Sequence, residues 1–432
     1  MRRAIAALPW LVAIAGCSES AIAPERAGDV SPAASASASA SAIHRVIHVD
    51  ASAAAGGDGS GRAPYASLAD AVTQVNGQGG GAIEMAPGLY TVSRTIHVLA
   101  STSIRGANEP VLDASGLPTG ELIGGIETRI VGATSLGALP VLAVGRPDGP
   151  MSGVTIANVT LQAPGVQGTA LEIVRVQDMT LRDNIFSNSG FAGINVIASS
   201  GRIKGNYITL NGCGACIAAG NAASPATVEF KGNRSVRNTL AGLLLNGSGT
   251  TMVEPAGLLV ATVRGNDIGD NSGSASLGYG IRVFVIRRDP PDAQATGSVE
   301  ATFDDNRVAN NKIGFVLDAG FPYRTFAGHP DSRTYSGSAS LSLHGNVLTG
   351  NATTALFTFT RSTAALNQAQ LRPSAGNSWK YFQDATYSIM DPDLTLASYK
   401  LDHPVADPFD HRTLHNVLTY NGTVVPNGRT LP

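Results

Sequence analysis

The chain has 432 residues, of which 14 % are charged, and its formal net charge is −2. This near-neutral balance, without a basic excess, argues against a nucleic-acid partner. Fifty glycines together with the low charge favour a tightly turned all-β protein over a helical one.

The chain begins with a segment typical of export. Arg2 and Arg3 precede an apolar run that is too short to span a bilayer. The run ends in Ile14-Ala15-Gly16-Cys17, which resembles a bacterial lipobox, although an ordinary signal peptide cut near Ala21 or Ala23 is the alternative.

We therefore expect a lipoprotein signal peptide over residues 1–16 and lipidation at Cys17, which would anchor an exported protein at the outer membrane or cell surface. Residues 17–43 are rich in Ala and Ser and have too little apolar bulk to pack. They are predicted to form a flexible linker between the lipid and the folded domain.

The folded part is predicted to begin with a strand over residues 46–50, followed by a glycine-rich loop. Ser67 then caps a short helix, with Asp70 at the capping-box position. Such a helix would cover the open end of a stack of strands. Its apolar face comprises Leu68, Ala71, Val72 and Val75.

A repeat dominates residues 179–359. Each copy has alternating apolar residues, then a polar pair ending in Asn, then a second Asn four or five residues later. A weaker copy surrounds Asn158. The first Asn of each copy falls at Asn184, Asn206, Asn233, Asn266, Asn306 and Asn346.

Short strands at this period, with no helical pattern between them, predict a solenoid whose coils bury their apolar sides by stacking. Asn suits tight left-handed turns, and stacked Asn side chains can hydrogen-bond from coil to coil. We expect six side chains to point inward: Leu181, Ile203, Phe230, Val263, Phe303 and Leu343.

The strand, the PYASL-type helix and the PGLY turn, together with the repeats, resemble the pectin-lyase-like superfamily over about residues 45–370. The resemblance implies an all-β, right-handed parallel β-helix over residues 44–370 with a short N-terminal capping helix. The remaining residues, 371–432, would form a tail that packs on the β-helix or caps it. The superfamily includes polysaccharide lyases, hydrolases, epimerases and esterases, and fold alone does not decide among them.

Strand alternation places the residue after each inward position on the outer face, so that Arg182, Lys204, Lys231, Arg264, Asp304 and His344 should stack one per coil. A line of cations is a surface for a polyanion such as an acidic polysaccharide. Polar residues that merely face solvent are the alternative. Loops at 246–258, 287–298 and 318–338 should form a wall beside this face.

Catalytic residues are predicted with less support from the sequence. The resemblance implies an Arg or Lys base for a lyase, for which Arg264 or Arg282 is available, and Ca²⁺ bound by carboxylates such as Asp267 and Asp270. Arg282 is also predicted to contact substrate. A hydrolase would instead need paired carboxylates, for which Asp304 and Asp305 are the candidates.

Two further clusters have less specific interpretations. Cys213 and Cys216 are expected to form a buried free pair or a local disulfide. His403, His411 and His415 lie close together near the C-terminus, but Pro404 and Pro408 favour an extended tail over a metal site.

Two functions follow. The first is an envelope-anchored protein that binds an extracellular acidic polysaccharide and processes it as a lyase or hydrolase. The second is a non-catalytic surface adhesin or glycan-binding lipoprotein. An enzyme would need a base or carboxylates converging in a groove, which the structure can examine.

Overall fold

The computed structural model describes residues 46–358, with gaps at 147–148, 221–223, 248–255, 274–277, 285–295 and 319–333, and the backbone of four later strands between residues 382 and 425. The chain divides into two compact units, 1–43 and 44–432. The structure therefore concerns the second unit, and the predicted signal peptide, Cys17 and linker lie outside the described residues.

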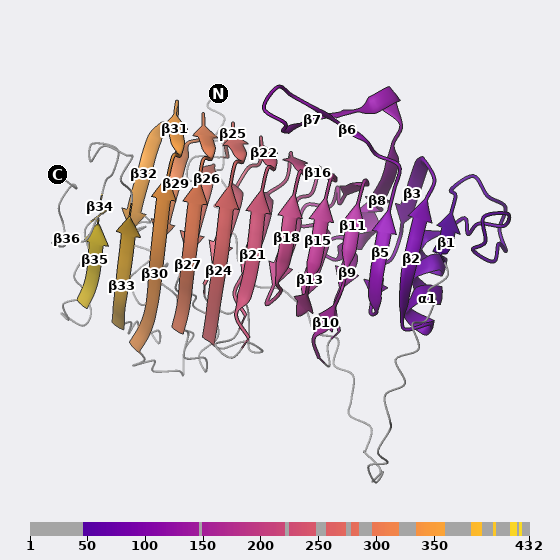
Figure 1. Cartoon of the computed structure of the whole chain (residues 1–432), viewed down its shortest axis with the longest axis horizontal. Coiled ribbons are helices and arrows are strands. Elements are labelled where there is room, and N and C mark those ends of the chain that lie inside the picture. Colours follow the sequence, from indigo (N-terminus) through magenta and orange to yellow (C-terminus); the bar gives the residue numbers. More distant parts are fainter. Residues whose placement is uncertain are drawn as a thin grey trace, which may run out of the picture. The chain divides into compact units, whose positions relative to one another are not determined.

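The chain winds through three sheets in turn, and successive turns of the chain stack as parallel strands (Figure 1). Sheet 1 has thirteen strands, sheet 2 nine and sheet 3 ten. All pairings within these sheets are parallel, except for the last one in sheet 1. This arrangement is the predicted parallel β-helix.

The strands of sheet 1, in spatial order, are β1 (Val46–Val49), β2 (Gly80–Met85), β5 (Ser101–Arg105), β11 (Thr155–Ala157), β15 (Met179–Arg182), β18 (Gly201–Lys204), β21 (Ala226–Lys231), β24 (Ala256–Arg264), β27 (Thr296–Asp304), β30 (Thr334–His344), β33 (Phe382–Met390), β35 (His415–Tyr420) and β36 (Thr423–Val425).

Sheet 2 comprises β3 (Gly88–Val92), β8 (Thr128–Gly132), β12 (Thr160–Gln162), β16 (Ile185–Ser187), β19 (Tyr207–Thr209), β22 (Arg234–Val236), β25 (Asp267–Gly269), β28 (Arg307–Ala309) and β31 (Val347–Thr349). Sheet 3 comprises β4 (Ile96–Val98), β9 (Pro140–Val144), β13 (Thr169–Val174), β17 (Ala192–Ile197), β20 (Cys213–Ala218), β23 (Ala241–Asn246), β26 (Tyr279–Phe284), β29 (Ile313–Asp318), β32 (Thr353–Thr358) and β34 (Leu401–Asp402).

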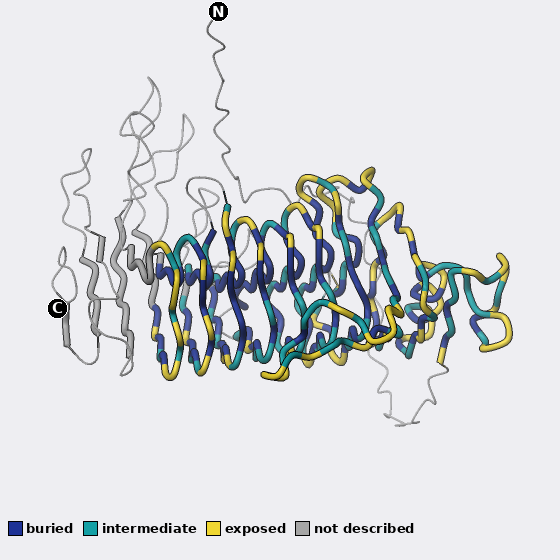
Figure 2. Tube along the Cα trace, turned by 90° about the horizontal axis from the view of Figure 1, so that it is seen from above, coloured by how far each residue is buried: buried dark blue, intermediate teal, exposed yellow. Residues whose placement is uncertain are grey.

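The interior of the coils is apolar, because alternate residues of all three sheets point into it. The six side chains predicted to point inward from sheet 1 are all 0–2 % exposed. Figure 2 shows buried residues recurring along every described coil. Burial of this continuous core is the main stabilising term, at about 25 cal/mol per Å² of apolar surface.

Two buried asparagine ladders run along the coils at the corners between the sheets. At the first corner, between sheets 1 and 2, each amide from Asn184 to Asn306 donates to the Asn of the next coil, as Asn206 does to Asn233 over 3.0 Å. Each also donates to a carbonyl of the preceding coil, as Asn206 does to Leu181 over 3.0 Å. The predicted coil-to-coil hydrogen bonding is therefore confirmed. The second ladder, between sheets 2 and 3, consists of Asn211, Asn238, Asn271, Asn311 and Asn351.

The prediction that the ladder asparagines adopt the left-handed backbone conformation is wrong. The left-handed residue is the one before each of them, for example Asp183 (φ 58°) before Asn184 and Gly232 (φ 61°) before Asn233. Asn158, assigned to the weaker repeat, is itself left-handed (φ 60°), and Val159 stands at the ladder position. The ladder side chains are thus free to point inward and pair.

A helix and a hairpin stand outside the three sheets. The helix α1 (Leu68–Gly77) packs against β1, β2 and β4 and buries the four predicted apolar residues, while the Ser67 side chain accepts a hydrogen bond from the Ala69 amide over 3.1 Å. The hairpin β6 (Pro110–Leu112) and β7 (Pro118–Leu122), hereafter the arm, projects from the coils in Figure 1.

The parallel stack is longer than the sequence indicated at two places. Residues 256–258, 296–298 and 334–338, which were assigned to loops, belong to β24, β27 and β30 of sheet 1. Beyond residue 370, β33 and β35 continue sheet 1 in parallel pairing, and β36 ends it in antiparallel pairing. Residues assigned to the tail thus take part in the sheet.

Candidate functional site

The candidate site is a row of side chains on the outer face of sheet 1. Strand register pairs Arg182 with Lys204, Lys204 with Lys231, and Lys231 with Arg264. We call these four residues the cation row. Neighbouring strands lie about 4.8 Å apart, so the row presents one positive charge per coil along the stack. Lys204 and Arg264 are exposed, and Arg182 and Lys231 are partly buried.

The members of the cation row differ in their ion pairs. Arg182 forms an ion pair with Asp183, with 2.8 Å between Nη1 and Oδ2. Among the described residues, Lys204, Lys231 and Arg264 have no acidic partner within ion-pair distance. Glu229, on the same face, pairs instead with Arg202 over 3.6 Å. The charges of these three residues are therefore available to a ligand.

The row continues beyond Arg264 with an acid and a histidine. Register places Asp304 beside Arg264 and His344 beside Asp304. The Asp304 Oδ1 atom lies 3.5 Å from His344 Nδ1, and the Ser342 hydroxyl lies 3.3 Å from the same nitrogen. Arg264, Asp304 and His344 are thus neighbours. Asp305 occupies the left-handed corner position (φ 52°) rather than the outer row, so adjacency in sequence does not make the two aspartates equivalent.

Arg282 does not belong to this face. It lies on β26 in sheet 3 and is 4 % exposed, with its guanidinium carbon 5.1 Å from the Tyr279 ring centroid and 5.4 Å from that of Phe284. Cation–π contacts of this kind hold a charged side chain against an apolar surface. Arg282 is therefore not part of the cation row, and its roles as a base or a substrate contact stay predictions.

The proposed calcium ligands do not converge either. Asp267 lies on the outer face of sheet 2, where its carboxylate accepts hydrogen bonds from Arg234 Nε over 3.1 Å and from Arg307 Nη1 over 2.7 Å. Asp270 is a left-handed corner residue that accepts from the Asn310 amide. No group of three or more His, Cys, Asp or Glu residues in the described part of the chain is arranged to hold a metal. These residues do not fit a calcium site.

Arg234 links Asp267 of sheet 2 to the arm. Arg234 bridges Asp267 and Asp113 of the arm, and its Nη1 also donates to the Pro118 carbonyl over 3.1 Å. Partial burial would raise the pKa of Asp113, but hydrogen bonds from the Leu117 amide, the Arg234 guanidinium and the Ser115 amide outweigh it and lower the pKa below its ordinary value. Sequence reasoning missed this pairing because 121 residues separate its partners.

The outer face of sheet 3 carries a small second apolar cluster. Ala192, Cys213, Cys216, Ala241 and Leu244 are buried there, and Cys213 and Cys216 form a disulfide, one of the two predicted alternatives. Farther along the same face, burial raises the pKa of Glu172, against the opposing effects of a hydrogen bond from Asn195 and of the charge of His97. The described residues of this face are mostly buried and form no open row of charges like that on sheet 1.

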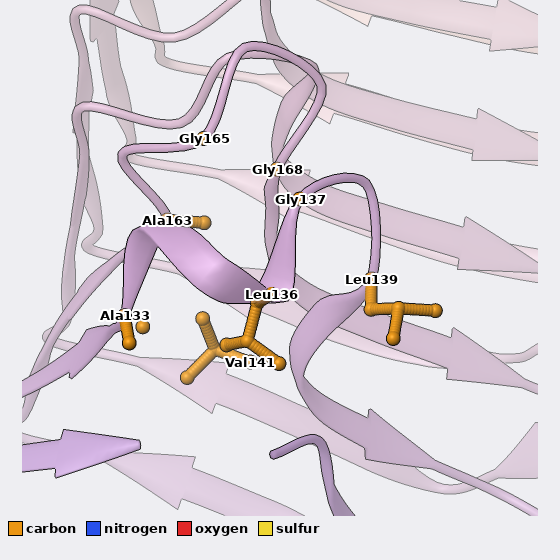
Figure 3. Close-up of a pocket in the computed structure, with 9 residues that line it drawn as sticks. Ala133, Leu136, Gly137, Leu139, Val141, Ala163, Gly165 and Gly168 are labelled. Atoms are coloured by element: carbon orange, nitrogen blue, oxygen red, sulfur yellow. The ribbon is translucent and has the colours of Figure 1, made fainter. Parts of the chain in front are cut away.

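A shallow depression with no enclosed space for a water molecule lies at the corner between sheets 2 and 3 (Figure 3). It is lined by glycines and apolar side chains, among them Leu136, Leu139 and Val141. None of its lining residues carries a titratable group, so it offers no acid–base chemistry. It lies away from the cation row, which is on sheet 1.

Several predicted features fall outside the described residues. Of the loops expected to form a wall, the structure mainly describes residues 256–258, 296–298 and 334–338, which belong to strands. His403 and His411 are likewise not described, and only the backbone of His415, at the start of β35, is. Among the described residues no helix has both the length and the apolar character needed to cross a membrane.

The chain is similar to several solved structures and matches one family model. The sequence matches no curated protein. Among solved structures, ORF18 of Geobacillus virus E2 aligns with a TM-score of 0.45 at 12 % identity over 87 % of this chain, which spans 61 % of the viral protein. A pectin methylesterase of Aspergillus niger aligns with a TM-score of 0.37 at 13 % identity, over 70 % of this chain and 85 % of its own.

A third structure, pectin methylesterase PemA from Erwinia chrysanthemi, aligns with a TM-score of 0.33 at 10 % identity, over 89 % of this chain and 91 % of its own. At such identities the likeness concerns the fold alone. The family model described as a right-handed β-helix region matches residues 149–371, slightly more than half of the chain. The chain therefore belongs to the family of right-handed β-helix regions.

Proposed function

We propose that this protein binds a linear acidic polysaccharide along the outer face of sheet 1. The observation that carries the proposal is the run of three unpaired cations, Lys204, Lys231 and Arg264, on successive strands in register. Fixed charges at the strand spacing match a polymer that carries carboxylates at regular intervals. The ligand would lie along the stack, across the strands.

Hydroxyl side chains on the same face support a sugar ligand. Two residues before Arg182 and Arg264, the outer position is occupied by Thr180 and Thr262, and Thr302 occupies it on the next strand. On the two strands between, the position is occupied by the ion pair of Arg202 and Glu229. A hydroxyl both donates and accepts hydrogen bonds, as sugar hydroxyls do. A cation row beside hydroxyl groups thus supplies partners for both the carboxylates and the hydroxyls of a uronic-acid chain.

The binding test uses the full chain and sodium polygalacturonate, with dextran as the uncharged polymer. We expect binding of polygalacturonate and none of dextran, with affinity falling as salt screens the charges. The triple variant Lys204→Gln/Lys231→Gln/Arg264→Gln should bind at least tenfold more weakly. Arg202→Gln is the matched control, because Arg202 is a cation on the same face that is already paired with Glu229.

Two results would overturn this proposal. One is undiminished binding by the triple variant, and the other is equally strong retention of the wild type on dextran. Equal affinity for polygalacturonate and for a phosphate polymer would also count against a polysaccharide-specific role, because it would make the row a general polyanion surface.

Catalysis on the bound polymer is a second candidate, favoured by the position of Asp304 and His344 directly beyond Arg264. The distance between Asp304 Oδ1 and His344 Nδ1 is 3.5 Å. If a bound substrate ordered the two side chains, this contact could shorten to a hydrogen bond across which a proton is transferred. A lyase would release unsaturated product, which absorbs ultraviolet light, and Arg264→Ala should abolish that signal. Binding without turnover would favour the adhesin or glycan-binding alternative.

The envelope location is also part of the proposal, and Cys17 carries it. Lipidation of Cys17 would tether the β-helix through residues 17–43 and hold the binding face outside the membrane. Incorporation of a labelled fatty acid into the wild type, but not into Cys17→Ser, tests it. Labelling that persists in the variant would contradict it.

A further inference from the structure

Each member of the outer row on sheet 1 is followed by a left-handed corner residue, and the identity of that residue varies in a regular way. Gly205, Gly232 and Gly265, with φ between 61° and 65°, follow the three unpaired cations. Asp183 and Asp305, with φ of 58° and 52°, follow Arg182 and Asp304 at the two ends of the run. Gly345 (φ 61°) also follows His344, which contacts Asp304, so glycine is not confined to unpaired charges along the whole outer row. Within the cation row, however, glycine follows only the three members without an ion pair among the described residues.

Backbone conformation does not explain this division. Glycine adopts the left-handed conformation at the lowest cost, so the backbone alone would favour glycine along the whole corner. The presence of Asp183 and Asp305 shows that the corner also accepts aspartate. At Gly232 and Gly265 a Cβ atom would meet nothing within 4 Å, so a side chain has room there, whereas at Gly205 it would lie 2.8 Å from Asp183 Oδ1.

Charge does distinguish the two residue types. Asp183 follows Arg182 and neutralises it, with 2.8 Å between the charged atoms. An aspartate in place of Gly232 would stand in the same relation to Lys231, and one in place of Gly265 in the same relation to Arg264. Glycine at these positions leaves the preceding cation without such a partner.

We propose that Gly232 and Gly265 are specificity-determining residues that, together with Gly205, keep three successive cations unneutralised. The inference rests on the proposed polysaccharide binding and narrows the ligand. The site would be three coils long, with its charged positions spanning about 10 Å at the strand spacing. It would be ended by Asp183 on one side and Asp304 on the other. Its ligand is a polymer with a carboxylate on every sugar, because a charge on every second sugar would leave part of the row unmatched.

The decisive comparison is Gly232→Asp against Gly232→Asn. The two substitutions add side chains of nearly equal size, and both residue types adopt left-handed corners in this protein, as Asp183 and Asn310 show. Only the aspartate adds a charge. We expect Gly232→Asp to bind polygalacturonate about tenfold more weakly than the wild type and Gly232→Asn to bind within twofold of it. The gap should narrow as salt rises.

A second measurement tests the charge interval of the ligand. Hyaluronan carries one carboxylate for every two sugars, whereas polygalacturonate carries one on each. At equal carboxylate concentration the wild type should prefer polygalacturonate by at least tenfold. Gly265→Asp and Gly265→Asn, at the other open corner, should repeat the pattern of Gly232. Equal denaturation midpoints within each pair would show that the fold is unaffected.

The outcomes separate this inference from the binding proposal. If Gly232→Asp binds as well as Gly232→Asn while the triple cation variant has lost affinity, the glycines do not set specificity, although the row still binds. If both Gly232 variants lose affinity equally, shape rather than charge is responsible, and the inference is wrong. If the triple cation variant binds normally, the binding proposal fails first.

Discussion

Two rows of polar residues run along the coils only two residues apart, and they differ in burial and in the partners of their polar groups. Asn233 belongs to the inner ladder, is fully buried and has both ends of its amide paired with neighbouring coils. Lys231 belongs to the outer cation row and has no ionic partner among the described residues. In sequence, both are simply one polar residue per repeat.

The difference shows that a repeated polar residue is structural when its hydrogen bonds close within the stack, and is available to a ligand when they do not. A buried amide must be paired, because an unpaired polar group in the interior costs about 1–3 kcal/mol. An exposed ammonium group has water as its partner and gains little from the fold. Stability and binding should therefore respond to different rows, and variants of each row can establish this.

The largest expected effect is loss of stability when the inner ladder is cut. Asn233→Leu would remove the amide that donates to Ile203 and Asn266 and the oxygen that accepts from Asn206. Because these groups are buried, their former partners would remain unpaired, and we expect a loss of about 3 kcal/mol or more. Denaturant titration measures the free energy of unfolding.

The control for this variant is Asn310→Gly, at an exposed left-handed corner (φ 58°) where glycine is well tolerated. It should change the free energy of unfolding by less than about 0.5 kcal/mol. Similar losses in the two variants would mean that burial of the ladder is not what makes an asparagine structural, and the contrast between the two rows would collapse.

The role of a residue could be predicted from the sequence only where its neighbours in the fold follow the repeat. The Asn ladder and the cation row were predictable because alternation fixes the face and the repeat fixes the neighbour. Asp267 pairs with Arg234 and Arg307, its register neighbours on sheet 2. The contact of Arg234 with Asp113 of the arm and the burial of Arg282 on sheet 3 do not follow from the repeat. The repeat pattern carries no signal of an insertion folding back on a distant coil.

The next largest loss of stability is expected at the disulfide on the buried outer face of sheet 3. Replacing both cysteines, in Cys213→Ala/Cys216→Ala, should lower the free energy of unfolding by about 2 kcal/mol, as expected for so short a covalent loop. The loss should be smaller than that of Asn233→Leu. Comparing the wild type with and without a reducing thiol checks the assignment, because reductant should not alter the double variant. A double variant as stable as the wild type would contradict the prediction.

The stability of the arm should depend on pH. Because Asp113 has a lowered pKa in the fold, its ionised form stabilises the arm above its unfolded pKa of about 3.9, and this contribution is lost as pH falls through the lower, folded value. Asp113→Asn should thus weaken the arm by about 1 kcal/mol at pH 6 and make no difference near pH 2.

Hydrogen exchange of the arm amides, compared between the wild type and Asp113→Asn at each pH, measures this effect. Ser115 and Leu117, whose amides bond to Asp113, are the reporters. An effect of Asp113→Asn that is independent of pH would show that the carboxylate charge does not hold the arm. Arg234→Met should weaken the arm as well, since Arg234 is the cation that Asp113 contacts.

The smallest expected effect on stability is also the sharpest test of the comparison. Lys231→Gln should leave the free energy of unfolding within about 0.5 kcal/mol of the wild type, because the ammonium group has no ionic partner among the described residues. In the triple variant Lys204→Gln/Lys231→Gln/Arg264→Gln, like charges on neighbouring strands are removed, so stability should rise by up to about 1 kcal/mol at low salt. Added salt should erase the gain, because it screens the repulsion in the wild type. A fall of more than about 1 kcal/mol in the triple variant would mean that these cations are structural, like the asparagines beside them.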